Sequence, residues 1–239
     1  MSMSFALSNI HKKFGDLYVL QGLNMNVEEH KLICILGPSG CGKTTLLNII
    51  SGVFPPDQGE LLGFAGKTIS YLFQETRLLR WKTVEENIDF VLKDQFTKHQ
   101  RSEIIKRYVD MVGLREFKNY RPDKLSGGMK QRVAIARAFA YPADILLMDE
   151  PFKGLDLQLK TTLMQAFVDL WLMDHRSVFF VTHDIDEALL LGEEIYVLNE
   201  RPGSVKGVIS HRIPHNERNL DSKNMRQVER EIYQLLTVP

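Results

Sequence analysis

The sequence of 239 residues has little cysteine, no net charge and no long hydrophobic run. Its two cysteines, Cys34 and Cys41, cannot be paired by spacing, a usage that suits a reducing cytoplasm. Lys plus Arg and Asp plus Glu both number 30, so no overall basic field attracts nucleic acid, and none is expected as a partner. No apolar run approaches membrane-spanning length. Residues 1–10 lack the pattern of a cleaved secretory signal, and any work at a membrane is expected to need a separate embedded partner.

A hydrophobic content of 44% excludes a disordered chain and predicts one large domain, with or without a smaller lobe. Short apolar runs bounded by turn residues predict buried strands, and helical patterns follow several of them. The predicted strands are 31–36, 68–73, 145–148, 178–182 and 195–198, and the helices are 44–50, 157–173 and 184–191. This alternation favours an α/β fold with a mostly parallel sheet covered on both faces.

The remaining segments have different patterns. Residues 83–140 alternate charged and apolar side chains at helical spacing, which predicts a helical lobe inserted into the sheet domain. Residues 203–212 are candidates for late strands, and 221–236 predict an exposed amphipathic helix. We therefore expect a single domain over 1–239, with a core of about 1–82 and 141–215, a lobe of about 83–140 and a C-terminal helix.

A glycine-rich segment fits the pattern G-x-x-x-x-G-K-[ST] between the strand at 31–36 and the helix that continues through Thr45. In such a segment, here called the phosphate loop, successive backbone N–H groups converge on phosphates, and the helix dipole adds positive potential. The lysine would reach the β and γ phosphates, and the threonine hydroxyl would bind Mg²⁺. The loop predicts ATP binding through Gly37, Pro38, Ser39, Gly40, Cys41, Gly42, Lys43 and Thr44.

Two carboxylates, Asp149 and Glu150, follow the predicted strand 145–148 directly. The carboxyl edge of a parallel sheet is where ligands bind. Asp149 is suited to the Mg²⁺ shell, and Glu150 to polarising a water for attack on the γ phosphate. Alone, an Asp-Glu pair at a strand end is usually a solvated turn, so this interpretation depends on the phosphate loop.

The segment 125–132, Leu-Ser-Gly-Gly-Met-Lys-Gln-Arg, precedes a strongly helical stretch and resembles the signature motif of ATP-binding cassette proteins. Its place between the phosphate loop and Asp149 matches the order in that family. Physically, Ser126, Gly127 and Gly128 would form a second anion site at a helix N-terminus. A serine-capped helix start explains Ser126 but not the whole motif.

The resemblance, which covers about residues 5–198, implies roles for four further residues. Phe14 resembles the aromatic residue that stacks on adenine, and an exposed turn is the alternative. Gln74 resembles the glutamine that senses Mg²⁺ and the attacking water. Asp156 resembles the aspartate that contacts the partner subunit, although Gly154 stands where alanine is commonest, and it also suits a helix N-cap. His183 resembles the switch histidine at the γ phosphate.

The family resemblance further implies a P-loop NTPase core with an N-terminal antiparallel β portion, and a dimer in which each ATP lies between the phosphate loop of one copy and residues 126–129 of the other. Residues 76–88 resemble importers of nitrate, alkanesulfonates and taurine, with Arg80 in place of their usual proline. This implies an ATPase on the cytoplasmic face of the membrane, peripheral to a permease and indirectly served by a solute-binding protein. Trp81 either docks on that permease or seals the lobe.

Two other classes share parts of this pattern. Soluble cassette ATPases of DNA repair, chromosome maintenance or translation use the same ATP chemistry, but their long coiled-coil insertion or second cassette is missing from this sequence. A small-molecule kinase leaves the signature segment and His183 unexplained. No residue indicates which solute is transported.

Overall fold

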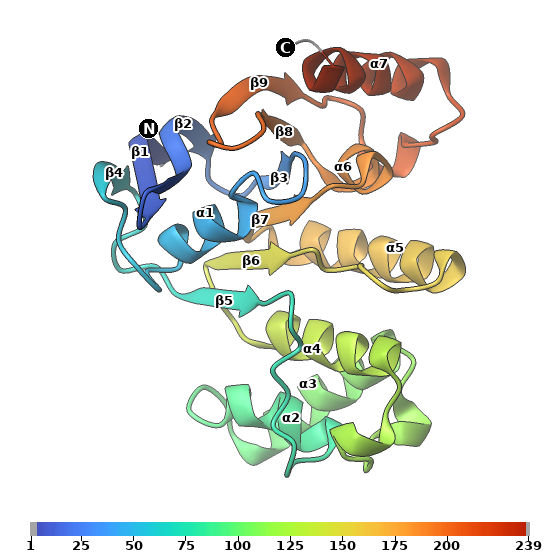
Figure 1. Cartoon of the computed structure of the whole chain (residues 1–239). Coiled ribbons are helices and arrows are strands. Elements are labelled where there is room, and N and C mark those ends of the chain that lie inside the picture. Colours follow the sequence, from blue (N-terminus) through green and yellow to red (C-terminus); the bar gives the residue numbers. More distant parts are fainter. Residues whose placement is uncertain (1–3, 238–239) are drawn as a thin grey trace.

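The structure of the chain, a computed structural model, describes residues 4–237 (Figure 1). The extreme ends of the predicted domain, residues 1–3 and 238–239, lie outside the described residues. Strands and helices alternate along most of the chain. In order they are β1 Ser4–Phe14, β2 Leu17–Glu28, β3 Leu32–Leu36, α1 Lys43–Ile50, β4 Gln58–Leu62, β5 Ile69–Leu72, α2 Val84–Leu92, α3 Lys98–Met111, α4 Gly127–Ala140, β6 Ile145–Asp149, α5 Leu157–Asp174, β7 Ser177–Thr182, α6 Ile185–Leu191, β8 Glu194–Leu198, β9 Val205–Ser210 and α7 Lys223–Thr237.

The central sheet is six-stranded, in the order β5-β6-β7-β3-β8-β9. Neighbouring strands from β5 to β8 are parallel, and β9 pairs antiparallel with β8. Every residue of β3, β6 and β7 is buried, which explains why these strands read as continuous apolar runs without alternation. The predicted α/β fold with a mostly parallel sheet is confirmed, and each predicted strand matches an observed one to within a residue at either end.

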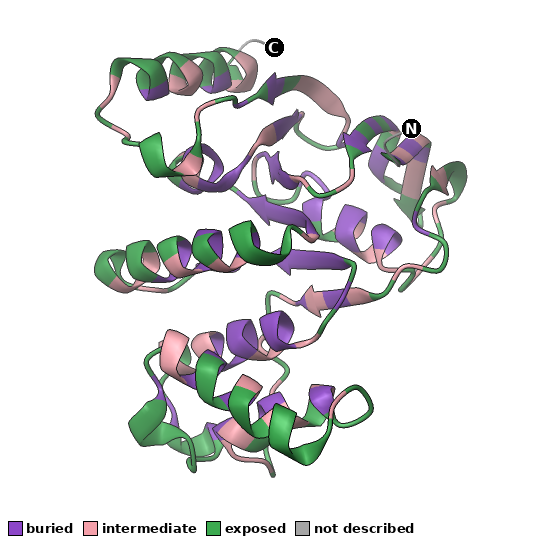
Figure 2. Ribbon diagram, turned by 180° about the vertical axis from the view of Figure 1, so that it is seen from behind, coloured by how far each residue is buried: buried purple, intermediate pink, exposed green. Residues whose placement is uncertain are grey.

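Successive side chains of the central strands enter two different cores because a strand alternates its faces. Leu32, Cys34 and Leu36 of β3 pack in a core with the helices α2 to α6. Ile33 and Ile35 pack in a second core with α1 and the N-terminal strands. The sheet is therefore covered on both faces, and Figure 2 shows its central strands β3, β6 and β7 as continuously buried.

The first strands form a separate antiparallel sheet in the order β2-β1-β4. Phe5 of β1 anchors it by packing on Phe64 and on Phe179 of β7, with ring centroids 4.7 and 5.8 Å apart. This sheet is the antiparallel β portion that the family resemblance implied. It places Phe14, the last residue of β1, near the phosphate loop.

Residues 83–140 fold as helices, and within this described stretch there is no strand. Capping boxes start the first two helices, from Thr83 with Glu86 and from Thr97 with Gln100. At the other end of the chain, 203–212 supplies a single strand, β9, and α7 buries Met225 and Ile232. Among the helices of residues 4–237, none is long and apolar enough to cross a membrane.

His211, just after β9, is buried, and neither of its ring nitrogens has a hydrogen-bond partner among the described residues. Burial, with the nearby charges of Arg218 and His215, lowers the pKa of His211 from 6.5 to about 4. Between these two pH values the unfolded chain binds a proton that the folded chain does not, so stability falls as pH falls through this window.

We therefore expect His211→Phe to reduce the loss of unfolding free energy between pH 7 and pH 5 by about 1 kcal/mol, because the variant has no imidazole that protonates on unfolding. Urea unfolding of the parent protein and the variant at pH 7 and at pH 5 measures this change in unfolding free energy. An equal loss in the parent and the variant would contradict the prediction.

Candidate active site

The phosphate loop connects buried β3 to α1, and its geometry requires glycine at Gly42. This residue caps α1 with φ +109°, and a Cβ there would lie 2.7 Å from a Leu20 methyl and 3.0 Å from the Val19 carbonyl. Gly40 also has a left-handed φ of +81°. The loop consequently curls around the N-terminus of α1, where backbone N–H groups without helical acceptors can meet an anion.

Lys43 lies buried against its own loop, with its Nζ donating to the carbonyls of Gly37 at 2.7 Å and Pro38 at 2.9 Å. An ammonium has three donors, so this arrangement leaves one for a phosphate oxygen. Both carbonyls fix the charged group at the mouth of the loop. The lysine is therefore preorganised for an anion.

Thr44 and Asp149 line the same cavity at the edge of the sheet, and the threonine side chain favours the charged form of the carboxylate. Burial raises the pKa of Asp149, assisted by the charge of Glu150, while the Thr44 side chain opposes the rise. Both groups offer the hard oxygens that Mg²⁺ prefers, and this cation usually takes few protein ligands beside phosphates and water. In residues 4–237 no cluster of three or more His, Cys, Asp or Glu side chains could hold a metal alone. The pair fits a cation that is shared with a bound phosphate.

Glu150 lies one residue further on, in a left-handed conformation with φ +48°. Its backbone N–H donates to Val181 of β7 at 3.0 Å, which keeps the residue against the sheet. Its Oε1 is 3.0 Å from His183 Nδ1, and its Oε2 forms an ion pair with Lys153. Although burial alone would raise the pKa of Glu150, the bonds from Lys153 and His183 outweigh it and lower the pKa.

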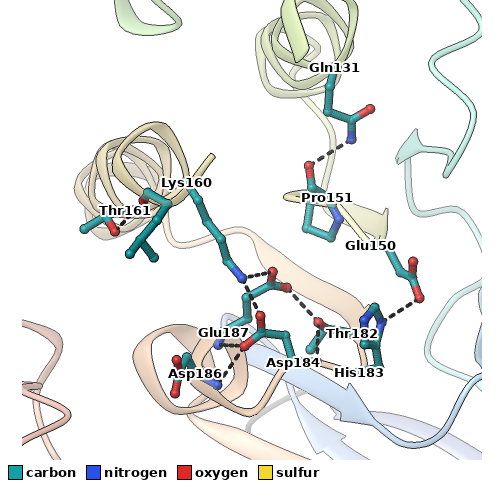
Figure 3. A network of polar contacts seen from close by, with 11 residues as sticks. Gln131, Glu150, Pro151, Lys160, Thr161, Thr182, His183, Asp184, Asp186 and Glu187 are labelled. Carbon is teal, nitrogen blue, oxygen red and sulfur yellow. Dashed lines mark hydrogen bonds and ion pairs between the residues drawn. The ribbon is translucent and has the colours of Figure 1, made fainter. Parts of the chain in front are cut away.

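A polar network fixes the segment that carries His183 (Figure 3). Lys160 of α5 forms ion pairs with Asp184 at 2.5 Å and Glu187 at 2.7 Å. Glu187, which is buried, accepts a bond from the Thr182 hydroxyl at 2.7 Å. The network joins α5, the end of β7 and the start of α6, so His183 extends from a segment held on both sides.

A cavity of about 380 Å³ lies over these groups. Its walls come from the N-terminal sheet, the phosphate loop, the ends of β5 and β6, and the loop between β8 and β9. The lining residues are Phe14, Val19, Ser39, Gly40, Gly42, Lys43, Thr44, Thr45, Gln74, Asp149, Glu150, Lys153 and Arg201.

Phe14 is half-exposed at this cavity, and its ring packs edge-on against Phe54 with centroids 5.7 Å apart. Its exposed surface is available to a flat ring. The adjoining residues 199–204 are fixed by Gly203, whose N–H donates to the Val19 carbonyl at 2.8 Å. A Cβ on Gly203 would lie 2.2 Å from the Cys41 carbonyl, so only glycine allows this close approach to the phosphate loop.

The segment 126–128 lies elsewhere, at the N-terminus of α4. Ser126 caps that helix by accepting from the Met129 N–H at 3.3 Å, and both Ser126 and Gly127 are exposed. In Figure 1, β5 and β6 run between α1 and α4. The second predicted anion site is thus well formed but does not line the cavity of its own chain.

Comparison with known proteins identifies the family. A family model described as ABC transporter matches residues 20–153, more than half of the chain. The chain belongs to the ABC transporter family. It is 40% identical over 221 residues to an uncharacterised ABC transporter ATP-binding protein of Methanocaldococcus jannaschii, with 87% of this chain and 82% of that protein covered. It is 36% identical over 245 residues to the aliphatic sulfonates import ATP-binding protein SsuB of Bacillus cereus, with 97% and 95% covered.

Comparison with solved structures supports the same family assignment. The dimeric, post-hydrolysis structure of an ATP-binding cassette bound to ADP and phosphate matches with a TM-score of 0.79 and 32% identity, covering 88% of this chain and all of that one. The chain is therefore an ABC ATPase with the P-loop NTPase fold of these cassettes. Its recognition from the phosphate loop and signature segment is confirmed.

The cassette brings together most of the predicted site residues. The cavity lining contains ten of them, including Phe14, Gln74 and Asp149. Gly37 and Pro38 instead line a second cavity with His183, and Cys41, within the loop, is buried. Asp156 caps α5, accepting from the Leu159 N–H at 3.0 Å, and with the signature segment it lies outside the cavity. The roles of these residues remain predictions.

Three residues that line the cavity were not predicted from the sequence: Val19, Lys153 and Arg201. Lys153 follows Glu150 by three residues, and this spacing could have indicated an ion pair. Arg201 reaches the site only because Gly203 packs on the phosphate loop, which no local pattern indicates. Val19 has no sequence signal that distinguishes it from any other strand residue.

Proposed function

We propose that this cassette is the ATP-hydrolysing subunit of an importer for sulfonates or a related small solute, working as a dimer on a separate membrane permease. The observation that carries the proposal is the separation of two well-formed anion sites, the phosphate loop and residues 126–128. Neither completes the other within one chain, whereas a second copy could supply the missing half. The similarity to a sulfonate importer subunit over nearly the whole chain supports the transport role.

The proposed chemistry assigns one task to each group. Phe14 stacks on the adenine, and Lys43 with the loop N–H groups binds the phosphates. Thr44 and Asp149 would hold Mg²⁺, which when bound neutralises charge on the β and γ phosphates. Glu150 orients the attacking water, Gln74 lies beside it, and His183 contacts the γ phosphate.

Completion of the site would come from the second copy. Ser126, Gly127 and Gly128 of that copy would bind the γ phosphate at the N-terminus of α4, and Asp156 would contact the partner. Loss of the γ phosphate removes the anion that both halves share, so the dimer reopens after hydrolysis. Opening and closing on this cycle would move the permease.

The direct test of this function is reconstitution. The cassette and its permease are placed in lipid vesicles with the cognate binding protein. We expect ATP hydrolysis to be faster when the binding protein carries its solute than when it is solute-free. A rate unaffected by permease and solute would favour a soluble ABC ATPase over an importer subunit.

The proposed permease contact is the segment around Trp81. Trp81 is 68% exposed, which is unusual for so large an apolar side chain. Buried Asn87 holds the backbone on either side, accepting from the Leu79 N–H at 2.8 Å and donating to the Thr83 carbonyl at 2.8 Å. The Asn87 bonds hold the backbone of a segment that presents an exposed Trp81 side chain between Arg80 and Lys82, and an aromatic anchor with a charged rim suits a docking surface for a permease helix.

Replacing Trp81 and Leu79 by Ala is expected to reduce co-purification with the permease about tenfold or more, because exposed aromatic anchors dominate such interfaces. ATP affinity should remain unchanged. Tyr233→Ala, at a 49% exposed aromatic residue on α7, is a matched control. Equal complex yields for both variants would rule out this surface.

A further inference from the structure

Lys153 occupies the rim of the active-site cavity and contacts the carboxylate proposed to orient water. Its Nζ forms an ion pair with Glu150 Oε2 across a tight turn, in which the Lys153 N–H donates to the Glu150 carbonyl at 3.2 Å. The other oxygen, Oε1, is 3.0 Å from His183 Nδ1. Both oxygens of Glu150 are therefore engaged by protein groups in the single chain.

The backbone of this turn is fixed, but the lysine side chain is not. Phe152 is buried, and Gln131 of α4 donates to the Pro151 carbonyl at 2.8 Å (Figure 3). By contrast, the Lys153 side chain is 53% exposed, while that of Glu150 is 10% exposed. Of the two partners in the ion pair, the lysine is the one that can leave.

A carboxylate orients a water through an oxygen lone pair, and an ammonium group bound to the same oxygen competes with that water. Lys153 also lies between Glu150 and Asp156, in the segment proposed to meet the second copy. It is followed by Gly154, where a Cβ would meet nothing within 4 Å, so another chain has room to approach.

We propose that Lys153 is a positioning residue that restrains hydrolysis, holding Glu150 away from water in the single chain until a second copy displaces the lysine. The proposal rests on the function assigned above to Glu150. The ion pair between Lys153 and Glu150 would thereby limit ATP hydrolysis by a chain that has not yet formed a dimer.

Other charges facing the site would remain after loss of the lysine. Asp149, the last residue of β6, directly precedes Glu150, and Lys43 approaches from the phosphate loop. Arg201 lines the cavity from the loop after β8, and His183 contacts Oε1. The prediction therefore concerns one ion pair and does not require a general change in the charge of the site.

The experiment measures single-turnover hydrolysis of bound ATP at protein concentrations where sedimentation shows a monomer. Lys153→Met should raise the rate about threefold to tenfold, the effect of removing one partly exposed ion pair, with the ATP dissociation constant unchanged. Lys153→Arg retains the charge and should match the parent. Lys118→Met is a matched control, because Lys118 is 47% exposed and paired with Glu85 far from the site.

An unchanged or lower rate for Lys153→Met would overturn the proposal, as would Lys153→Arg behaving like Lys153→Met. The double variant with Glu150→Gln separates this inference from the proposed function. If the double variant is inactive while Lys153→Met shows no gain, only the role of Lys153 fails. If the double variant hydrolyses ATP at the rate of Lys153→Met, the role of Glu150 itself fails.

Discussion

Glu150→Gln is expected to lower ATP hydrolysis by about a hundredfold to a thousandfold, the usual contribution of a positioned general base. An amide of the same shape keeps the contact with His183 but cannot accept a proton from the attacking water. ATP binding should persist, because Glu150 lies beyond the phosphate loop. Phosphate release measures the rate, and filter binding measures the retained nucleotide.

The same variant is expected to accumulate as an ATP-bound dimer, since the γ phosphate that joins the two anion sites is no longer removed. Size exclusion with saturating ATP should show a shift from monomer to dimer that reverses when ADP replaces ATP. Asp186→Asn, on the exposed face of α6, is a control that should neither slow ATP hydrolysis nor accumulate as an ATP-bound dimer. A Glu150→Gln chain that stays monomeric with ATP would count against the shared site.

Lys43→Met is expected to weaken ATP binding by roughly a hundredfold, because it removes charge-assisted hydrogen bonds to the phosphates. The methionine retains most of the buried stem, so folding should be preserved even though the Gly37 and Pro38 carbonyls lose their donor. Fluorescent-nucleotide titration measures the affinity, and the urea midpoint tests the fold. Unchanged affinity in a folded variant would remove the phosphate loop from the site.

The central part of the site was predictable because the chemistry is local in sequence. A buried apolar strand, glycines at positions of left-handed backbone and a following helix place residues 37–44 without any distant contact. Asp149 and Glu150 were predictable for a similar reason, since parallel strands end at one edge. The signature segment required family resemblance, because Ser126 alone indicates only a helix cap.

The parts of the fold and the site that the sequence does not predict depend on contacts between segments far apart in the chain. β1 and β2 carry register irregularities, which blur their alternation, and their position near the cavity follows from Phe5 packing on β7. Arg201 enters the site through the close approach of Gly203 to Cys41, and Lys153 through a turn whose shape depends on a left-handed Glu150. The domain boundaries and the residue roles remain predictions.

The central claim is that each ATP lies between the phosphate loop of one copy and residues 126–128 of another. Mixing two defective chains, both carrying Glu150→Gln, tests it most directly. One chain also carries Lys43→Met. The other carries Gly127→Asp, where the added Cβ meets nothing within 4 Å, so the chain can fold while a carboxylate repels the γ phosphate.

A mixed dimer would contain one intact site, with the phosphate loop of the Gly127→Asp chain facing the signature segment of the Lys43→Met chain. Sedimentation with saturating ATP should therefore show dimers in the mixture and monomers for either chain alone. A mixture that remains monomeric while the Glu150→Gln parent dimerises would contradict the shared site, and so would dimerisation of either defective chain by itself.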